Sequence, residues 1–137
     1  MKRLATFTLV LLASCAYSQD PRYPHPSRSA PEPHEQVIRH GARATMSSTQ
    51  APWHAANCYA QAYVNRSGGR LAANVVRDGP DERWRVNVTD AVPGGAYVAV
   101  IRVVPAASGS TAEMFMTPMS HLGGGEGFRR SLAERCH

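Results

Sequence analysis

Between Trp53 and Asn65, apolar residues recur with the spacing of an α-helix. Apolar side chains cover most of the helix circumference there, and the polar ones form a narrow strip of His54, Asn57, Gln61 and Asn65. Pro52 suits the first turn of a helix, and the run Ser67-Gly68-Gly69 suits its end. The pattern therefore predicts a helix that is covered on most sides and lies against a sheet.

Four strand patterns follow this helix, and turn sequences separate them. They span Leu71 to Arg77, Arg83 to Thr89, Ala96 to Val104, and Thr111 to Thr117. The third is apolar at nearly every position, which is typical of a central strand with both faces covered. Because the connections are short, we expect an antiparallel meander in which consecutive strands pair.

A second helix is predicted at the end of the sequence, from about Glu126 to Cys136. Phe128, Leu132 and Cys136 follow the spacing i, i+4, i+8, so the cysteine falls on the buried stripe. Residues 51–137 are thus predicted to form a small α+β domain with the order α-β-β-β-β-α. We expect a four-stranded antiparallel meander with both helices on one face, clipped by a disulfide.

Residues 15–50 show no comparable pattern and are predicted to be a disordered linker. Prolines are frequent there, at positions 21, 24, 26, 31 and 33, and apolar residues are few. Burial of so few apolar side chains would not offset the conformational entropy that is lost when the chain becomes ordered. Proline-rich chain is stiff and extends by about 3.1 Å per residue, so some twenty residues would span ~60 Å.

The first fifteen residues carry the most specific motif in the sequence. Lys2 and Arg3 precede an apolar run from Leu4 to Ala13. This run has about ten residues, whereas a membrane-spanning helix needs roughly 20, so it predicts a signal peptide. The run ends in Leu12-Ala13-Ser14-Cys15. These four residues resemble the lipobox of the bacterial lipoproteins, in which an apolar residue and two small residues precede a cysteine.

The resemblance implies that residues 1–14 are removed and that Cys15 receives acyl chains. Each buried methylene of such a chain contributes about 0.8 kcal/mol, so two or three chains anchor a protein durably in lipid. Ala16 stands where the family's sorting rule places an aspartate in inner-membrane proteins. We therefore expect an outer-membrane lipid anchor, with the domain facing the periplasm or the cell surface. The alternative is an ordinary signal peptide that is cut after Ala16-Tyr17-Ser18.

Acylation of Cys15 would leave Cys58 and Cys136 as an even pair in an oxidising compartment. That count favours a disulfide between them. The alternative is a metal site that adds His137 to the two cysteines. Ligands so far apart in sequence make a poor zinc signature. We therefore expect a structural disulfide, with no metal and no cofactor.

The charge of the chain points away from nucleic acids. The formal net charge is +5, and loss of Lys2 and Arg3 with the signal would reduce it to +3. A charge this small is not typical of proteins that bind the phosphate backbone. Lys2 is also the sole lysine, so every base of the mature chain would be an arginine. We expect no nucleic-acid partner.

Three arginines form the candidate binding patch. Arg83 and Arg85 fall on the outward side of the second strand pattern, and Arg102 lies in the third. Such a patch would suit lipid A phosphates, peptidoglycan carboxylates or an acidic envelope protein. The alternative is a solvated face on which Glu113 and Asp90 neutralise these arginines across neighbouring strands.

No catalytic motif frames the residues that could carry out acid–base chemistry. His54 and His121 lie within the predicted domain, as do Ser108, Ser110 and Ser120. A hydrolase site would need one of these serines beside an oriented histidine, and no nucleophile motif surrounds any of them. We therefore assign no catalytic residue and predict that the protein is not an enzyme.

The function predicted from the sequence is non-catalytic binding at the outer membrane. The protein would be an accessory component of an envelope assembly, held by lipid through Cys15. One alternative is an inhibitor or binder of cell-wall enzymes or glycan. A second alternative is a hydrolase in which His54 or His121 acts as the base.

Overall fold

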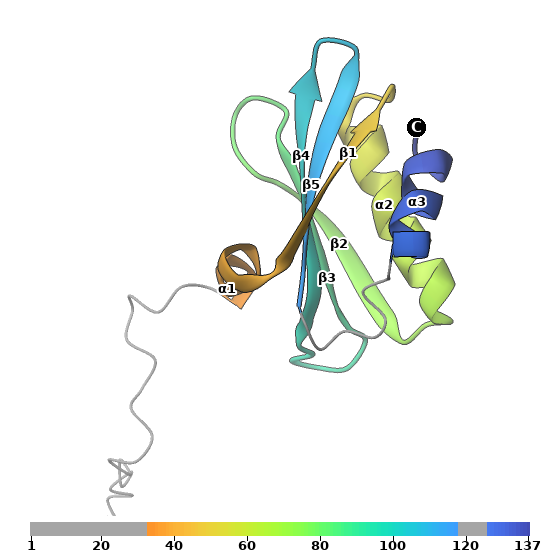
Figure 1. The fold of residues 1–137 in the computed structure, drawn as a ribbon. Coiled ribbons are helices and arrows are strands. Elements are labelled where there is room, and N and C mark those ends of the chain that lie inside the picture. The colour runs from red at the N-terminus through yellow and green to blue at the C-terminus, as the bar shows by residue number, and fades with distance from the viewer. Residues whose placement is uncertain (1–32, 118–125) are drawn as a thin grey trace, which may run out of the picture. The chain divides into compact units, whose positions relative to one another are not determined.

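The computed structural model describes residues 33–117 and 126–137, which form three helices and one antiparallel sheet (Figure 1). The helices are α1 (Pro33–His40), α2 (Pro52–Ser67) and α3 (Glu126–Arg135). The strands are β1 (Ala42–Ser48), β2 (Leu71–Arg77), β3 (Trp84–Asp90), β4 (Tyr97–Ala106) and β5 (Gly109–Met116). They lie in the order β1-β5-β4-β3-β2. None of the described helices is long and apolar enough to cross a membrane.

The predicted α+β class is confirmed, but the predicted four strands are one too few. Strands β2 to β5 form the expected meander, and β1 adds a fifth strand beside β5. Both α1 and β1 lie within residues 15–50, so the prediction of linker up to residue 50 is wrong. The predicted signal peptide and Cys15 lie outside the described residues.

Strand β1 escaped the sequence analysis because its own residues are weakly apolar. Its sequence, ARATMSS, has small and polar side chains, and only Met46 and Ser48 are buried among those whose burial is described. The strand is held by a register of seven residue pairs with β5, from Ala42 opposite Met116 to Ser48 opposite Ser110. Its stability thus comes from backbone pairing with a partner distant in sequence, which a local pattern does not reveal.

One face of the sheet is covered by α2 and α3 (Figure 1). Alanines on α2 let the helix approach the strands closely, since Ala55 and Ala56 are fully buried. Larger side chains fill the layer between helices and sheet: Tyr59, Tyr63, Ile101, Met114 and Leu132. The predicted signals at the two ends of α2 are confirmed, because Pro52 lies in its first turn and Gly68 ends it in the left-handed conformation with φ 60°.

Strand β4 is the middle strand, as predicted, and both of its faces are covered. A bulge opposite Val88 and Thr89 turns the consecutive residues Val98 and Ala99 towards the same core. Val100 points the other way and packs with Phe115 and with Val37 of α1. The continuous apolar run therefore reflects the bulge together with a second layer, α1, on the opposite face of the sheet.

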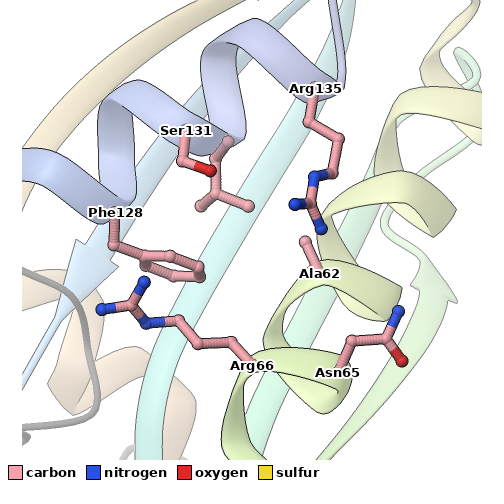
Figure 2. Close-up of a pocket in the computed structure, with 7 residues that line it drawn as sticks. Ala62, Asn65, Arg66, Phe128, Ser131 and Arg135 are labelled. Atoms are coloured by element: carbon pink, nitrogen blue, oxygen red, sulfur yellow. The ribbon is translucent and has the colours of Figure 1, made fainter.

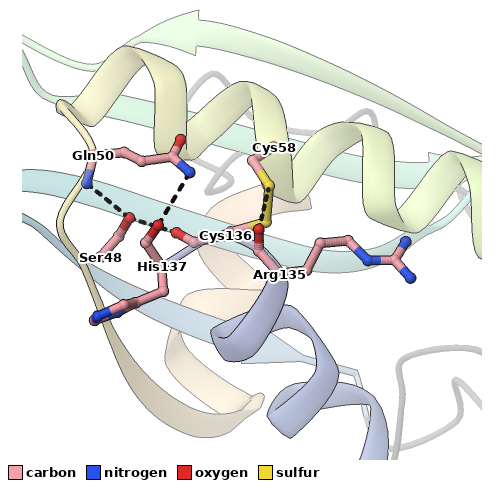
Figure 3. The surroundings of a disulfide bond; sticks show 6 residues. All are labelled: Ser48, Gln50, Cys58, Arg135, Cys136 and His137. Carbon is pink, nitrogen blue, oxygen red and sulfur yellow. Dashed lines mark hydrogen bonds between the residues drawn. A yellow bond between two sulfur atoms is a disulfide. The ribbon is translucent and has the colours of Figure 1, made fainter.

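The predicted disulfide joins Cys58 of α2 to Cys136, one residue beyond α3 (Figure 3). Its Cα atoms are 5.7 Å apart, and it closes a sequence separation of 78 residues. The hydroxyl of Ser48 donates a hydrogen bond to the Cys136 carbonyl. The backbone amide of Gln50 donates to that hydroxyl over 3.1 Å. The end of the chain is thus fixed to α2 and to the end of β1. Because both thiols are joined, the alternative metal site with His137 is wrong.

Gly109 provides a test of where β1 lies. A Cβ atom at Gly109 would lie 2.2 Å from the Ser48 carbonyl oxygen, and φ there is +108°. Gly94 also has positive φ, +70°, but a Cβ there would meet nothing within 4 Å. Urea unfolding should show that Gly109→Ala lowers the free energy of unfolding by about 3 kcal/mol or more, and Gly94→Ala by ~1 kcal/mol. Equal losses in the two variants would contradict the position of β1.

Candidate functional site

The predicted arginine patch lies on the sheet face that points away from α2 and α3. Arg85 and Arg102 are directly opposite each other on β3 and β4. Asp78, in the turn after β2, lies between them: its Oδ1 accepts from Arg85 Nη1 over 3.2 Å, and its Oδ2 is 3.9 Å from Arg102 Nε. Arg83 precedes β3, and its Nη2 is 3.7 Å from Asp81 Oδ2. Each of the three arginines therefore has a carboxylate partner.

This face carries a mixed charge network. Arg83 and Arg102 border a hollow of about 310 Å³, and Asp78 and Glu113 border it as well. The partner predicted for this face, Glu113, instead pairs with Arg43 of β1. Two carboxylates against two guanidinium groups leave the hollow without a strong preference for anions. The binding role of these arginines stays a prediction.

His34 is a member of this network that the sequence analysis assigned to the linker. Helix α1 places it over the sheet, where its side chain is 6% exposed. Its Nε2 atom is 2.8 Å from Arg85 Nη1, and its ring lies 6.2 Å from that of Tyr97. No local pattern pointed to His34, because α1 has only eight residues and buries mainly Val37 among its apolar side chains.

A second candidate site, the α2–α3 groove, is a hollow of about 300 Å³ between the two helices (Figure 2). Its floor is apolar, formed by Ala62, Phe128 and Leu132, and its polar groups come from Asn65, Arg66, Ser131 and Arg135. Figure 2 shows the guanidinium of Arg66 under the ring of Phe128 and that of Arg135 pointing from α3 towards α2. The groove thus combines an apolar floor with a guanidinium group at either end.

The arginines of the α2–α3 groove differ from those of the sheet face in having no acidic partner among the described residues. The guanidinium of Arg66 packs against the face of the Phe128 ring, with its Cζ 4.5 Å from the ring centroid. Within the described part of the chain, no carboxylate lies within 4.0 Å of Arg66, Arg129 or Arg135. Arg130, by contrast, is 3.6 Å from Glu126 on the outer side of α3. The α2–α3 groove therefore carries uncompensated positive charge, which suits a phosphate or carboxylate.

The sequence contains a signal for this groove in the spacing of two residues from the paired cysteines. Phe128 lies eight residues before Cys136, and Arg66 lies eight residues after Cys58. Once the two cysteines pair and the helices run antiparallel, these equal spacings bring Arg66 opposite Phe128. A pattern within α2 or within α3 alone does not reveal this groove, because the groove depends on how the two helices meet.

Among the described residues, the histidines and serines considered for acid–base chemistry do not form a catalytic site. His54 is exposed in the first turn of α2, and its side chain makes no hydrogen bond or ion pair with a residue that the structure describes. Ser110 is buried in β5 and Ser108 is exposed, whereas His121 and Ser120 lie outside the described residues. In residues 33–117 and 126–137, no three His, Cys, Asp or Glu side chains lie close enough to hold a metal ion.

No protein family, curated protein or solved structure matches this chain.

Two buried tyrosines of α2, Tyr59 and Tyr63, make the stability of the fold sensitive to high pH. Tyr63 packs edge-on against Phe128 with ring centroids 4.8 Å apart, and its hydroxyl donates to Met114 Sδ over 3.4 Å. Burial raises the pKa of Tyr63 well above its ordinary value of 10.0, although the positive charges of Arg129 and Arg66 oppose this rise. Burial raises the pKa of Tyr59 as well.

The raised pKa values predict a loss of stability above pH 10. The unfolded chain releases the phenolic protons first, so the native state is fully favoured below pH 10 and loses its advantage as pH rises further. The free energy of unfolding should fall by up to about 1.4 kcal/mol per pH unit for each buried tyrosine. Urea unfolding at pH 9, 10 and 11 should show a shallower decline for Tyr63→Phe than for the unchanged chain. The same decline in both would contradict the burial of this phenol.

Proposed function

We propose that the protein is an outer-membrane lipoprotein whose domain serves as a non-catalytic binding component of an envelope assembly. Acylated Cys15 anchors the chain, and the domain binds a partner through the α2–α3 groove. The partner supplies a phosphate or carboxylate group, because these anions match the planar guanidinium groups of Arg66 and Arg135. The observation that carries the binding role is the presence of these arginines without a carboxylate partner among the described residues.

Two features support the assignment to the cell envelope. The motif Leu12-Ala13-Ser14-Cys15 stands at the end of an apolar run, where lipid attachment requires it. The disulfide between Cys58 and Cys136 suits an oxidising compartment, since thiols in a reducing cytoplasm stay unpaired. A signal that exports the chain and a disulfide that forms after export are consistent with each other.

The groove is suited to a partner that is anionic at one point and apolar beside it. Phe128 and Leu132 are buried, and they provide a firm floor under the arginine side chains. Arg66 is held against Phe128 by a cation–π contact, which limits its rotation. A partner group that enters between Arg66 and Arg135 would therefore meet, at Arg66, donors that are partly fixed in place before it arrives.

Cross-linking in the native envelope tests the proposal. We would compare the full chain with three variants, recovering each with an antibody against the purified protein and identifying its cross-linked partner. Cys15→Ala should move the protein from the membrane to the soluble fraction. Arg66→Gln/Arg135→Gln should stay in the membrane and lose the partner more than tenfold, because charge-assisted hydrogen bonds contribute about 1.5–3 kcal/mol each. Arg130→Gln is the matched control, since Arg130 is exposed and pairs with Glu126.

The two halves of the proposal can fail separately. If Cys15→Ala remains in the membrane fraction, the lipid anchor is wrong. If no discrete partner is recovered, or if the Arg66→Gln/Arg135→Gln variant recovers the same amount as Arg130→Gln, the α2–α3 groove is not the binding site.

A further inference from the structure

Strand β2 is an edge strand of the sheet, and some of its backbone groups have no partner among the residues that the structure describes. It pairs with β3 on one side and is the last strand in the order β1-β5-β4-β3-β2. The Asp78 amide donates to the Arg83 carbonyl over 2.7 Å, and the Ala91 amide donates to the Arg70 carbonyl over 3.0 Å. These two bonds fix the phase of the β2–β3 ladder: even-numbered residues of β2 bond to β3, and odd-numbered residues point outward.

The outward groups begin at Ala73. The amide of Leu71 is already used, because it donates to Ser67 Oγ over 3.0 Å. Ala73 and Val75 therefore each present an N–H and a C=O to the free edge, and no hydrogen bond of the described residues uses them. Their side chains lean towards α2, where they pack against the core. Backbone groups of this kind recruit an additional strand.

A groove runs along this edge between β2 and α2, and we call it the β2-edge groove. It has a volume of about 540 Å³ and lies on the other side of α2 from the α2–α3 groove, with Asn65 bordering both. Ala60, Val64, Ala73 and Val75 form its apolar part, and amide side chains of α2 line the rest: Asn57, Gln61 and Asn65. Trp53 borders one end, is 44% exposed, and has its ring 4.5 Å from that of Trp84.

We propose that the β2-edge groove binds an extended, uncharged peptide segment of a partner protein, which adds to the sheet as a sixth strand beside β2. The partner backbone pairs with the free groups of Ala73 and Val75, and every second side chain of the partner enters the groove. The segment is uncharged where it faces the groove, because none of the described lining residues carries a charge and a buried unpaired charge would be costly. Trp53 provides an apolar contact at one end.

The occupant is a partner segment rather than the N-terminal part of this chain. Prolines at positions 21, 24, 26 and 31 recur at intervals too short for a run of strand pairing, since proline has no N–H to donate. This site does not depend on the α2–α3 groove or on Cys15. It would remain if the function proposed above were wrong.

Selection from a library of random twelve-residue peptides displayed on phage tests the proposal, with full-length protein purified in detergent as bait. Selected peptides should be uncharged and alternate apolar with polar residues. Ala73→Pro removes an outward N–H that β3 does not use, and proline is tolerated at such an edge position. It should weaken the synthetic peptide at least tenfold in calorimetry, whereas Ala73→Ser, which keeps the N–H, should bind as the unchanged chain does.

A second measurement modifies the peptide and leaves the protein unchanged, so it does not depend on whether a variant folds. N-methylation of the peptide amides that face β2 should abolish binding, and N-methylation of the alternate amides should not. The proposal is overturned if no peptide is enriched, if both methylation patterns are equivalent, or if Ala73→Pro binds as well as Ala73→Ser. It is also overturned if sedimentation shows a dimer that Ala73→Pro dissociates, because the edge would then hold a second copy of this chain.

Discussion

The disulfide between Cys58 and Cys136 is the constraint on which the helical layer depends. Helix α3 has ten residues and buries two large apolar side chains, Phe128 and Leu132. Burial of these side chains contributes about 1.5–3 kcal/mol each, and a helix this short is marginal without such packing. A disulfide that closes a separation of 78 residues contributes about 4.5 kcal/mol in the chain-entropy description. The covalent bond is thus comparable to the whole apolar contribution of α3.

The position of α3 in turn creates the α2–α3 groove. Arg66 and Arg135 come from different helices, and they border one hollow because the disulfide holds the helices together. The last residues of the chain also contact the connection between β1 and α2, since the side-chain amide of Gln50 donates to the His137 carbonyl over 3.3 Å (Figure 3). On the opposite face of the sheet, α1 is held by a smaller apolar cluster and by His34 beside Arg85. The helices on the two faces are therefore held differently. A covalent bond joins α3 to α2 on one face, whereas a small apolar cluster and one polar contact hold α1 on the other.

Local patterns in the sequence were sufficient for the elements that form the core. The apolar spacing of α2, the run of β4 and the stripe of Phe128, Leu132 and Cys136 predicted these elements and their packing on one face. Strand β1 was missed because its stability comes from pairing with β5, and α1 was missed because it is short. The arginine sites also could not be predicted from local patterns alone. Residue types predicted positive charge, but the contacts of Asp78 with Arg85 and Arg102, and the absence of a described carboxylate near Arg66, depend on how distant segments meet.

Amide hydrogen exchange tests the central role of the disulfide most directly. We would compare the unchanged chain with a Cys58→Ala/Cys136→Ala variant and follow the amides of α3 and of β3 to β5 separately. If the bond holds α3 in place, the α3 amides of the variant should exchange nearly as fast as an unfolded chain, while those of β4 stay protected. Equal protection of α3 in both proteins would contradict this account, because packing alone would then hold the helix and the α2–α3 groove.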